Sequence, residues 1–347
     1  MTEFDRNAAN GKEALEAKKG EAAAFTKDLY LLAVTVIASV VGEKLTSELA
    51  RHLFRLFPFI TESPIPRAYS ADGFLYILKS DGIPVVTRNF YYALVWFVND
   101  AVIYTVPLLI FGCAFRGRLN FKKRGIPYEF KPYWVFLFFA AGYAFVYVSN
   151  IISNILAEVL RPVFGGDGLR NVFESVMPKN DTQTLIMFAS VGIIAPVCEE
   201  LIYRRFLLNH LRRYGDLQAV IITALLFGFF HGNLTQFLYA TMGGLVLGFV
   251  AVKANSVVPA MVVHSLNNTF DLAVRRLPVG TEIQTALFYG VIAAGVVSTA
   301  VMAYRGKLKI ENANPYISGG DRARIIAQNP LILIMVVVLA AVTIADS

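Results

Sequence analysis

Polar and ionisable side chains that could perform acid–base chemistry interrupt three apolar segments of the chain. The first segment contains two adjacent acids, Glu199 and Glu200, followed by Arg204. The i,i+4 spacing places Glu200 and Arg204 on one face of a helix, where they can form an ion pair. Because neighbouring helical positions are about 100° apart, we expect Glu199 to point elsewhere, toward a cavity. Pro196 cannot donate a helix hydrogen bond and predicts an irregularity just before the acids.

Two of the four histidines in the chain lie in the next polar-interrupted segments. Phe227 and His231 are one helical turn apart, as are His264 and Asn268, so each pair shares a helix face. Asn267 lies at i+3 from His264 and is the less favoured partner. A carboxylate, two imidazoles and an amide are sufficient for amide hydrolysis. That reaction needs an activated water, a stabilised oxyanion and a proton for the leaving amine.

Two other functions would use the same side chains. An ionisable residue inside a membrane span is unfavourable unless it is paired or lines a wet cavity, so these residues need an explanation. A proton- or ion-coupled transporter would use Glu199, His231 and His264 as a relay, although the sequence lacks the repeated halves of many transporters. A non-catalytic membrane immunity or adaptor protein would use them as ties between helices.

The composition predicts that these segments lie in a membrane. Of the 347 residues, 56% are hydrophobic and 16% are charged, whereas a typical soluble domain carries about 25% charged residues. Several apolar runs approach the roughly 20 residues that a bilayer span requires. We therefore predict an all-α, polytopic integral membrane protein with roughly eight or nine transmembrane helices. The expected spans lie near residues 29–42, 90–115, 133–156, 182–214, 217–230, 236–252, 257–273, 283–304 and 331–345.

We divide the chain into four regions. They are a cytoplasmic tail, an N-terminal transmembrane region, a catalytic transmembrane core and a C-terminal transmembrane region, at residues 1–25, 26–179, 180–275 and 276–347. Lys and Arg gather in the tail and in short loops between apolar runs, the pattern of cytoplasmic segments. This pattern predicts a protein of the cell membrane whose N-terminus is cytoplasmic. It also accounts for the net charge of +7. We therefore expect the lipid bilayer and a membrane-associated substrate as partners, and no nucleic acid.

The remaining cysteines and histidines have plainer interpretations. Cys113 and Cys198 lie in apolar surroundings and indicate neither a disulfide framework nor a cysteine metal cluster. We expect both to be small buried hydrophobic residues. His52 and His210 lie in amphipathic segments, and we expect both at the surface.

The three motifs together resemble those of the CPBP family of intramembrane proteases. That family includes the type II CAAX prenyl endopeptidases and the Abi proteins linked to bacteriocin self-immunity. Its motifs Glu-Glu-x-x-x-Arg, Phe-x-x-x-His and His-x-x-x-Asn occur here in order, at residues 199–204, 227–231 and 264–268. The resemblance covers about residues 180–275. It implies an intramembrane endopeptidase that cleaves a membrane-associated peptide or protein, with a prenylated C-terminal peptide as one candidate substrate.

The resemblance and the chemistry together suggest a role for each residue of the motifs. Glu199 would act as the general base and His231 would hold and polarise the water. His264 and Asn268 would donate hydrogen bonds to the oxyanion. Among the supporting residues, Phe227 would form a wall of the pocket. The remaining pair, Glu200 and Arg204, would orient the helix that carries Glu199.

The position of the site in the membrane and its use of a metal are less defined by the sequence. Straight spans would put Glu199 and His231 at opposite ends of adjacent helices, so we expect the fourth span to extend past Glu199. Two histidines and a carboxylate are the minimum set for catalytic zinc, and Glu199, His231 and His264 could supply it. The usual His-Glu-x-x-His zinc helix is absent from the sequence. The family has been described both as metalloproteases and as glutamate proteases, so either zinc or no cofactor is expected, and the metal-free chemistry is favoured.

Overall fold

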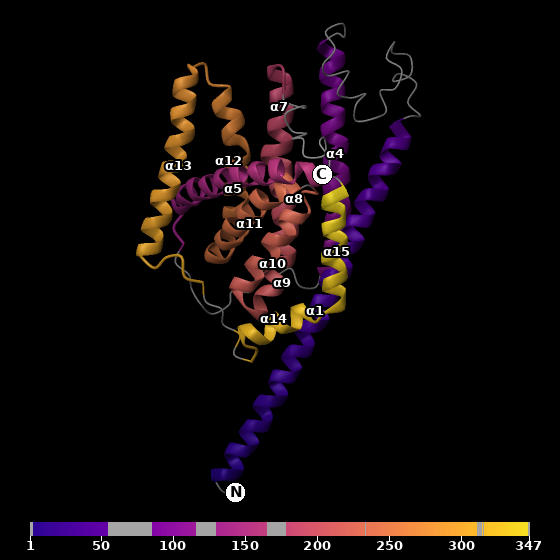
Figure 1. Ribbon diagram of the computed structural model, residues 1–347, viewed down its shortest axis with the longest axis vertical. Coiled ribbons are helices and arrows are strands. Elements are labelled where there is room, and N and C mark those ends of the chain that lie inside the picture. The colour runs from indigo at the N-terminus through magenta and orange to yellow at the C-terminus, as the bar shows by residue number, and fades with distance from the viewer. Residues whose placement is uncertain are drawn as a thin grey trace.

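The described part of the chain is entirely helical. The computed structural model describes residues 3–54, 85–115, 130–164, 178–232, 234–310, 314 and 316–345. Its long helices are α1 (Glu3–Phe54), α4 (Val85–Phe115), α5 (Trp134–Phe164), α11 (Leu234–Ala254), α12 (Val258–Arg275) and α13 (Thr281–Tyr304). The shorter ones include α10 (Asp216–Phe229), α14 (Gly319–Ala327) and α15 (Pro330–Ala345). No strand occurs in these ranges, which confirms the all-α prediction (Figure 1).

The number of membrane spans is lower than predicted within this part of the chain. Six helices are long and apolar enough to cross a membrane, and a seventh span results if the bent pair α14 and α15 is counted as one. The difference arises partly from α10, whose 14 residues cover only about 21 Å at about 1.5 Å each, less than the roughly 30 Å of a bilayer core. The predicted count of eight or nine is therefore not confirmed.

The N-terminal region forms one long helix instead of a separate tail and span. Helix α1 runs without interruption from Glu3 to Phe54. Its buried side chains include Phe25, Leu29, Leu32 and Val36, which recur at the helical period, and the helix packs against α4 and α15. In Figure 1 the N-terminal end of α1 extends away from the other helices. Residues 55–84, between α1 and α4, lie outside the described part of the chain.

The fourth predicted span is a continuous but irregular helical rod. It contains α7 (Asp181–Ala189), the π-helical turn η2 (Ser190–Ile194), α8 (Ala195–Glu200), the π-helical segment η3 (Leu201–Leu208), α9 (Asn209–Leu211) and η4 (Arg212–Tyr214). The six-residue helix α8 thus carries both acids between two π-helical segments, a feature frequent at functional sites. Pro196 lies in the first turn of α8, directly after η2. The rod passes well beyond Glu199, which confirms the expected extension.

Close packing of α10 against α11 brings the end of α10 to the middle of the protein. A Cβ atom added to Gly228 would lie 2.1 Å from Thr241 Oγ1 and 2.7 Å from the Phe237 carbonyl oxygen. Only glycine allows this approach of the two backbones. Helix α5 packs against α11 and α13, and in Figure 1 it runs across the direction of α4, α7 and α13. Helices α5, α11 and α13 thus pack around the helices that carry the second and third motifs.

Basic segments predicted on the cytoplasmic side meet at one end of the bundle. Arg213 lies 3.6 Å from Glu21 of α1, and the Lys253 ammonium donates to the backbone carbonyl of Lys309. This is the lower end in Figure 1, where α9 and α14 lie. Their shared location agrees with the predicted orientation, which remains a prediction, and most of the basic loop near residues 116–129 lies outside the described part.

The predictions for the side chains of His210 and Cys113 were wrong. His210 is buried: its Nε2 atom lies 3.0 Å from Asp28 Oδ2, and its ring centroid lies 5.0 Å from that of Phe115. The irregular rod turns this residue inward against α1 and α4. Cys113 is exposed, because the apolar surroundings of a membrane helix include its outer face. The side chain of His52 lies outside the described part.

Candidate active site

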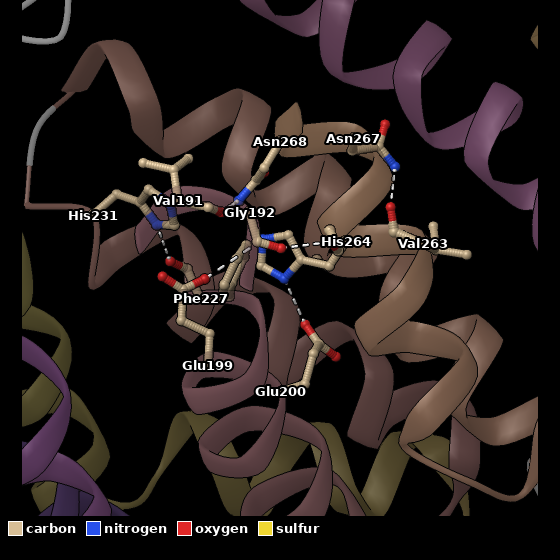
Figure 2. Close-up of polar contacts among 12 residues, drawn as sticks. Val191, Gly192, Glu199, Glu200, Phe227, His231, Val263, His264, Asn267 and Asn268 are labelled. Carbon is tan, nitrogen blue, oxygen red and sulfur yellow. Dashed lines mark hydrogen bonds and ion pairs between the residues drawn. The ribbon is translucent and has the colours of Figure 1, made fainter. Parts of the chain in front are cut away.

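All four predicted catalytic side chains line one cavity at the centre of the protein. The cavity has a volume of about 150 Å³ and is bounded by α5, α8, α10, α11 and α12. Glu199, His231, His264 and Asn268 all contribute to its wall. Figure 2 shows these side chains converging from the segments that carry the three motifs. The sequence placed them on separate helices, and folding brings them together.

Glu199 lies between two partners from different helices. Its Oε1 atom accepts a hydrogen bond of 3.1 Å from the hydroxyl of Tyr104 on α4. Its Oε2 atom lies 3.6 Å from His264 Nε2. The side chain is 17% exposed, so it is mostly enclosed but still reaches the cavity. It points away from its neighbour Glu200, as the helical geometry predicted.

Glu200 and Arg204 form a buried ion pair that also holds His264. Arg204 Nη1 donates to Glu200 Oε1 at 2.8 Å, and both side chains are 0% exposed. The same Oε1 atom accepts from His264 Nδ1 at 3.0 Å. Arg204 Nη2 donates to the Gly244 carbonyl of α11 at 3.1 Å. The pair was expected to orient the helix of Glu199, but its contacts reach further, to His264 and α11.

Phe227 explains the second motif through both its backbone and its ring. Its carbonyl oxygen lies 2.8 Å from His231 Nδ1. Since a carbonyl can only accept, Nδ1 carries the proton, and Nε2 is the acceptor in the neutral ring. The aromatic ring packs edge-on against His231 and His264, with centroid distances of 4.8 Å and 5.7 Å, and the Arg204 guanidinium lies 4.8 Å from its centre. Phe227 therefore forms the wall that was predicted and also fixes one imidazole.

The third motif is fastened to the π-helical turn η2. Asn268 Nδ2 donates to the Val191 carbonyl at 3.0 Å, and Ser265 donates from its hydroxyl to the Gly192 carbonyl. An amide nitrogen has two N–H groups, so Asn268 can hold this contact and still donate toward the cavity. Figure 2 shows Asn268, Val191 and Gly192 beside His264. The π-helical turn thus provides the carbonyl groups that anchor α12.

Asn267 also reaches the cavity, although the sequence favoured its neighbour. Its Nδ2 atom donates to the Val263 carbonyl of its own helix at 2.9 Å. Its Oδ1 atom is buried and accepts no hydrogen bond from the described part of the chain. A buried carbonyl oxygen of this kind is costly unless it finds a donor. Both asparagines line the cavity, so helical spacing alone did not separate their roles.

The arrangement does not resemble a zinc site. Within the described residues, no group of three or more His, Cys, Asp or Glu side chains is placed to hold a metal ion. Glu199, His231 and His264, which could have supplied zinc ligands, thus share a cavity without forming a ligand set.

Two residues of α4 belong to the site although no sequence motif indicated them. Tyr104 contacts Glu199, and Asp100 accepts a hydrogen bond of 2.7 Å from Ser190 of η2. Asp100 is 8% exposed and lies one helical turn before Tyr104, so both face the irregular rod. Asp100 could have been noticed in the sequence as an ionisable residue within the second predicted span. The sequence does not show, however, which residue it contacts.

Comparisons with known proteins agree with the motif region. Residues 181–270 match the family model described as type II CAAX prenyl endopeptidase Rce1-like. This range contains all three motifs, so the resemblance predicted from them is confirmed. Over 137 residues the chain is 26% identical to UPF0177 protein YvdC of Lactococcus lactis subsp. lactis (strain IL1403), covering 38% of this chain and 50% of that protein.

The chain therefore spans about half the length of this curated relative. No solved structure gives a significant match. Together, the family match and the long apolar helices identify the chain as an integral membrane protein.

Proposed function

We propose that this chain is an intramembrane endopeptidase that hydrolyses peptide bonds of a membrane-associated peptide or protein. The observation that supports this most is the meeting of Glu199, His231, His264 and Asn268 around one cavity. A carboxylate that is mostly enclosed, with an imidazole on one side and a phenol on the other, is suited to general base catalysis. The Rce1-like match covers residues 181–270, a range that includes these four residues, and this supports the proposal.

In this proposal, Glu199 and His231 position and activate the water. The neutral His231 ring has its Nδ1 proton directed to Phe227, so Nε2 can accept one hydrogen of the water. Glu199 takes the other proton as the water oxygen attacks the scissile carbonyl carbon. A water held by two acceptors directs its lone pairs toward the substrate. Glu199 then returns the proton to the leaving amine, which completes hydrolysis.

His264 and Asn268 would stabilise the tetrahedral intermediate. His264 is held by Glu200 through Nδ1, so Nε2 faces Glu199 and the cavity. In this role the ring carries a proton on both nitrogen atoms and donates from Nε2. The second N–H of Asn268 would be the other donor. Preorganised donors of this kind commonly contribute more than any other single effect in acyl transfer.

The substrate and the setting form the finer part of the proposal. The matched family is that of the type II CAAX prenyl endopeptidases, so a prenylated C-terminal peptide is a candidate substrate for this chain. The basic segments at one end of the bundle favour a cell-membrane protein with a cytoplasmic N-terminus. Residues 180–275 would be the catalytic core, with the regions before and after it as flanking membrane helices.

The test is a cleavage screen with the purified full chain in lipid vesicles. Membrane-spanning peptides and prenylated C-terminal peptides would be incubated with wild-type protein, Glu199→Gln, His231→Ala and His264→Ala, and the products identified by mass spectrometry. Glu282→Gln, at the exposed start of α13, is the matched control. We expect cleavage by wild type and the control alone. Cleavage at the wild-type rate by all three site variants would contradict the proposal.

A further inference from the structure

A second cavity lies on the other side of the Glu199 side chain. It has a volume of about 180 Å³ and is lined by residues of α1, α4, η3, α10 and α11. Glu199, Phe227 and His231 contribute to both cavities. These three residues therefore form the partition between the cavity that contains all four predicted catalytic residues and the second cavity, which faces α1 and α4.

The second cavity is rich in groups that can hydrogen-bond to water. Glu43 of α1, Tyr104 of α4 and Gln236 of α11 all line it. Pro107 of α4 is also part of the lining and has no N–H, so it cannot donate to the carbonyl of Ile103 one turn earlier. Ile103 lines the same cavity, and its carbonyl receives no helix hydrogen bond from Pro107. A cavity holds ordered water when it is polar, offers two to four partners, and is large enough for at least one molecule of about 30 Å³.

The residues that line the two cavities fall into two groups with different roles in the proposed hydrolysis. Glu199 and His231, which handle water in the proposed mechanism, border both cavities. His264 and Asn268, which stabilise the oxyanion, border only the first. A third cavity, between α5, α11 and α13, provides a contrast because its lining, which includes Leu245 and Phe249, is almost wholly apolar.

We infer that the second cavity is a water chamber that supplies the hydrolytic water to Glu199 from the side opposite the substrate. This inference rests on the proposed function. Water would pass from the chamber between Glu199 and His231, and Tyr104 would hold Glu199 Oε1 on the chamber side. Each turnover consumes one water: its oxygen forms a bond to the scissile carbon, the C–N bond breaks, and its proton passes through Glu199 to the amine. Tyr104 is a positioning residue in this scheme.

Thiol labelling tests the chamber without any need for activity. In a background with Cys113 and Cys198 replaced by alanine, a single cysteine would be placed at Ile103 in the chamber or at Leu245 in the apolar cavity. Vesicles carrying each variant would be treated with a small charged methanethiosulfonate. Because the thiolate is the reactive form and apolar burial disfavours it, we expect labelling of Ile103→Cys to be at least about tenfold faster. Equal or slower labelling of Ile103→Cys would overturn the inference, whether or not the protein is a protease.

Steady-state kinetics then tests the link to catalysis. Tyr104→Phe and Gln236→Leu remove chamber polarity, and we expect each to lower kcat by about tenfold or more with KM unchanged, because misplaced reacting groups slow the chemical step. Tyr239 lines the first cavity, where the substrate would bind. Tyr239→Phe is therefore the matched comparison, and its effect should fall on KM. A rise in KM with unchanged kcat in the two chamber variants would contradict a role in water supply. The labelling experiment tests the water chamber, and the cleavage assay tests the protease activity. Either proposal can therefore fail without the other.

Discussion

Glu200–Arg204 and Asp271–Arg275 are both carboxylate–arginine pairs at i,i+4 spacing, but they lie in different surroundings. The first pair is 0% exposed on both side chains and lies at the centre of the protein. In the second, near the end of α12, the arginine is 62% and the aspartate 41% exposed. The sequence patterns are equivalent, so the difference comes from the tertiary structure. Helical spacing thus identifies a possible ion pair, whereas burial determines how much stability the protein loses when the pair is broken.

The largest expected effect is on stability and separates the two pairs. Arg204→Ala removes the ion-pair partner of the buried Glu200 and the donor to the Gly244 carbonyl, so we expect a loss of about 3–5 kcal/mol in the free energy of unfolding. Arg275→Ala breaks an exposed pair and should cost at most about 1 kcal/mol. Denaturant unfolding of both variants in mild detergent measures the contrast. Similar losses in the two variants would show that Glu200 is not locked in a buried network.

The next largest effect compares the two asparagines of α12. Asn268→Ala removes an oxyanion donor and should lower kcat by about 10²–10³-fold. Asn267→Ala removes a buried acceptor that faces the same cavity, and we expect a smaller change that falls mainly on KM. Initial-rate kinetics with one cleavable peptide measures both. If Asn267→Ala has the larger effect on kcat, the roles of the two residues must be exchanged.

A third comparison concerns two helical glycines. A methyl group at Gly228 would collide with Thr241 and with the backbone of α11, so Gly228→Ala should destabilise the protein by about 1–3 kcal/mol through overpacking. At Gly290 of α13, an added Cβ atom would meet nothing within 4 Å, and alanine should be neutral or stabilising by up to about 1 kcal/mol. Thermal unfolding in detergent distinguishes them. Equal tolerance at both sites would mean that α10 and α11 are further apart than described.

The smallest expected effect is that of metal removal. No group of three or more His, Cys, Asp or Glu side chains is placed to hold a metal ion among the described residues. We therefore expect dialysis against a strong chelator to leave kcat unchanged. The assay would be repeated after zinc is added back. Loss of cleavage on chelation, with recovery on zinc, would require a metal-bound arrangement of the histidines.

Contacts within one helix turn were predictable from the sequence, because they depend only on helical geometry. The pairing of Glu200 with Arg204, the shared face of Phe227 and His231, and the different direction of Glu199 all follow from that geometry. The extension of the fourth span past Glu199 was also predicted, since the residues after it remain largely apolar.

Contacts between helices were not predictable in this way. Tyr104 is 95 residues from Glu199 in sequence, and no motif or spacing links α4 to α8. The burial of His210 against Asp28 was missed for the same reason. The contact of His264 with Glu200 crosses 64 residues, so the sequence did not show that the Glu200–Arg204 pair also contacts this imidazole. The span count depends on how α10, α12 and α14 lie in the membrane, because none of them is by itself among the six candidate spans.

The most direct test of the central claim is the single-turnover rate of Glu199→Gln at saturating peptide. The amide keeps the size of the carboxyl group and can still accept from Tyr104, but it cannot act as the base. We predict a rate at least about 10²-fold below wild type with unchanged peptide binding, the range typical of a lost general base. A rate within about threefold of wild type would contradict the assignment, because an effect that small is below the usual contribution of acid–base catalysis.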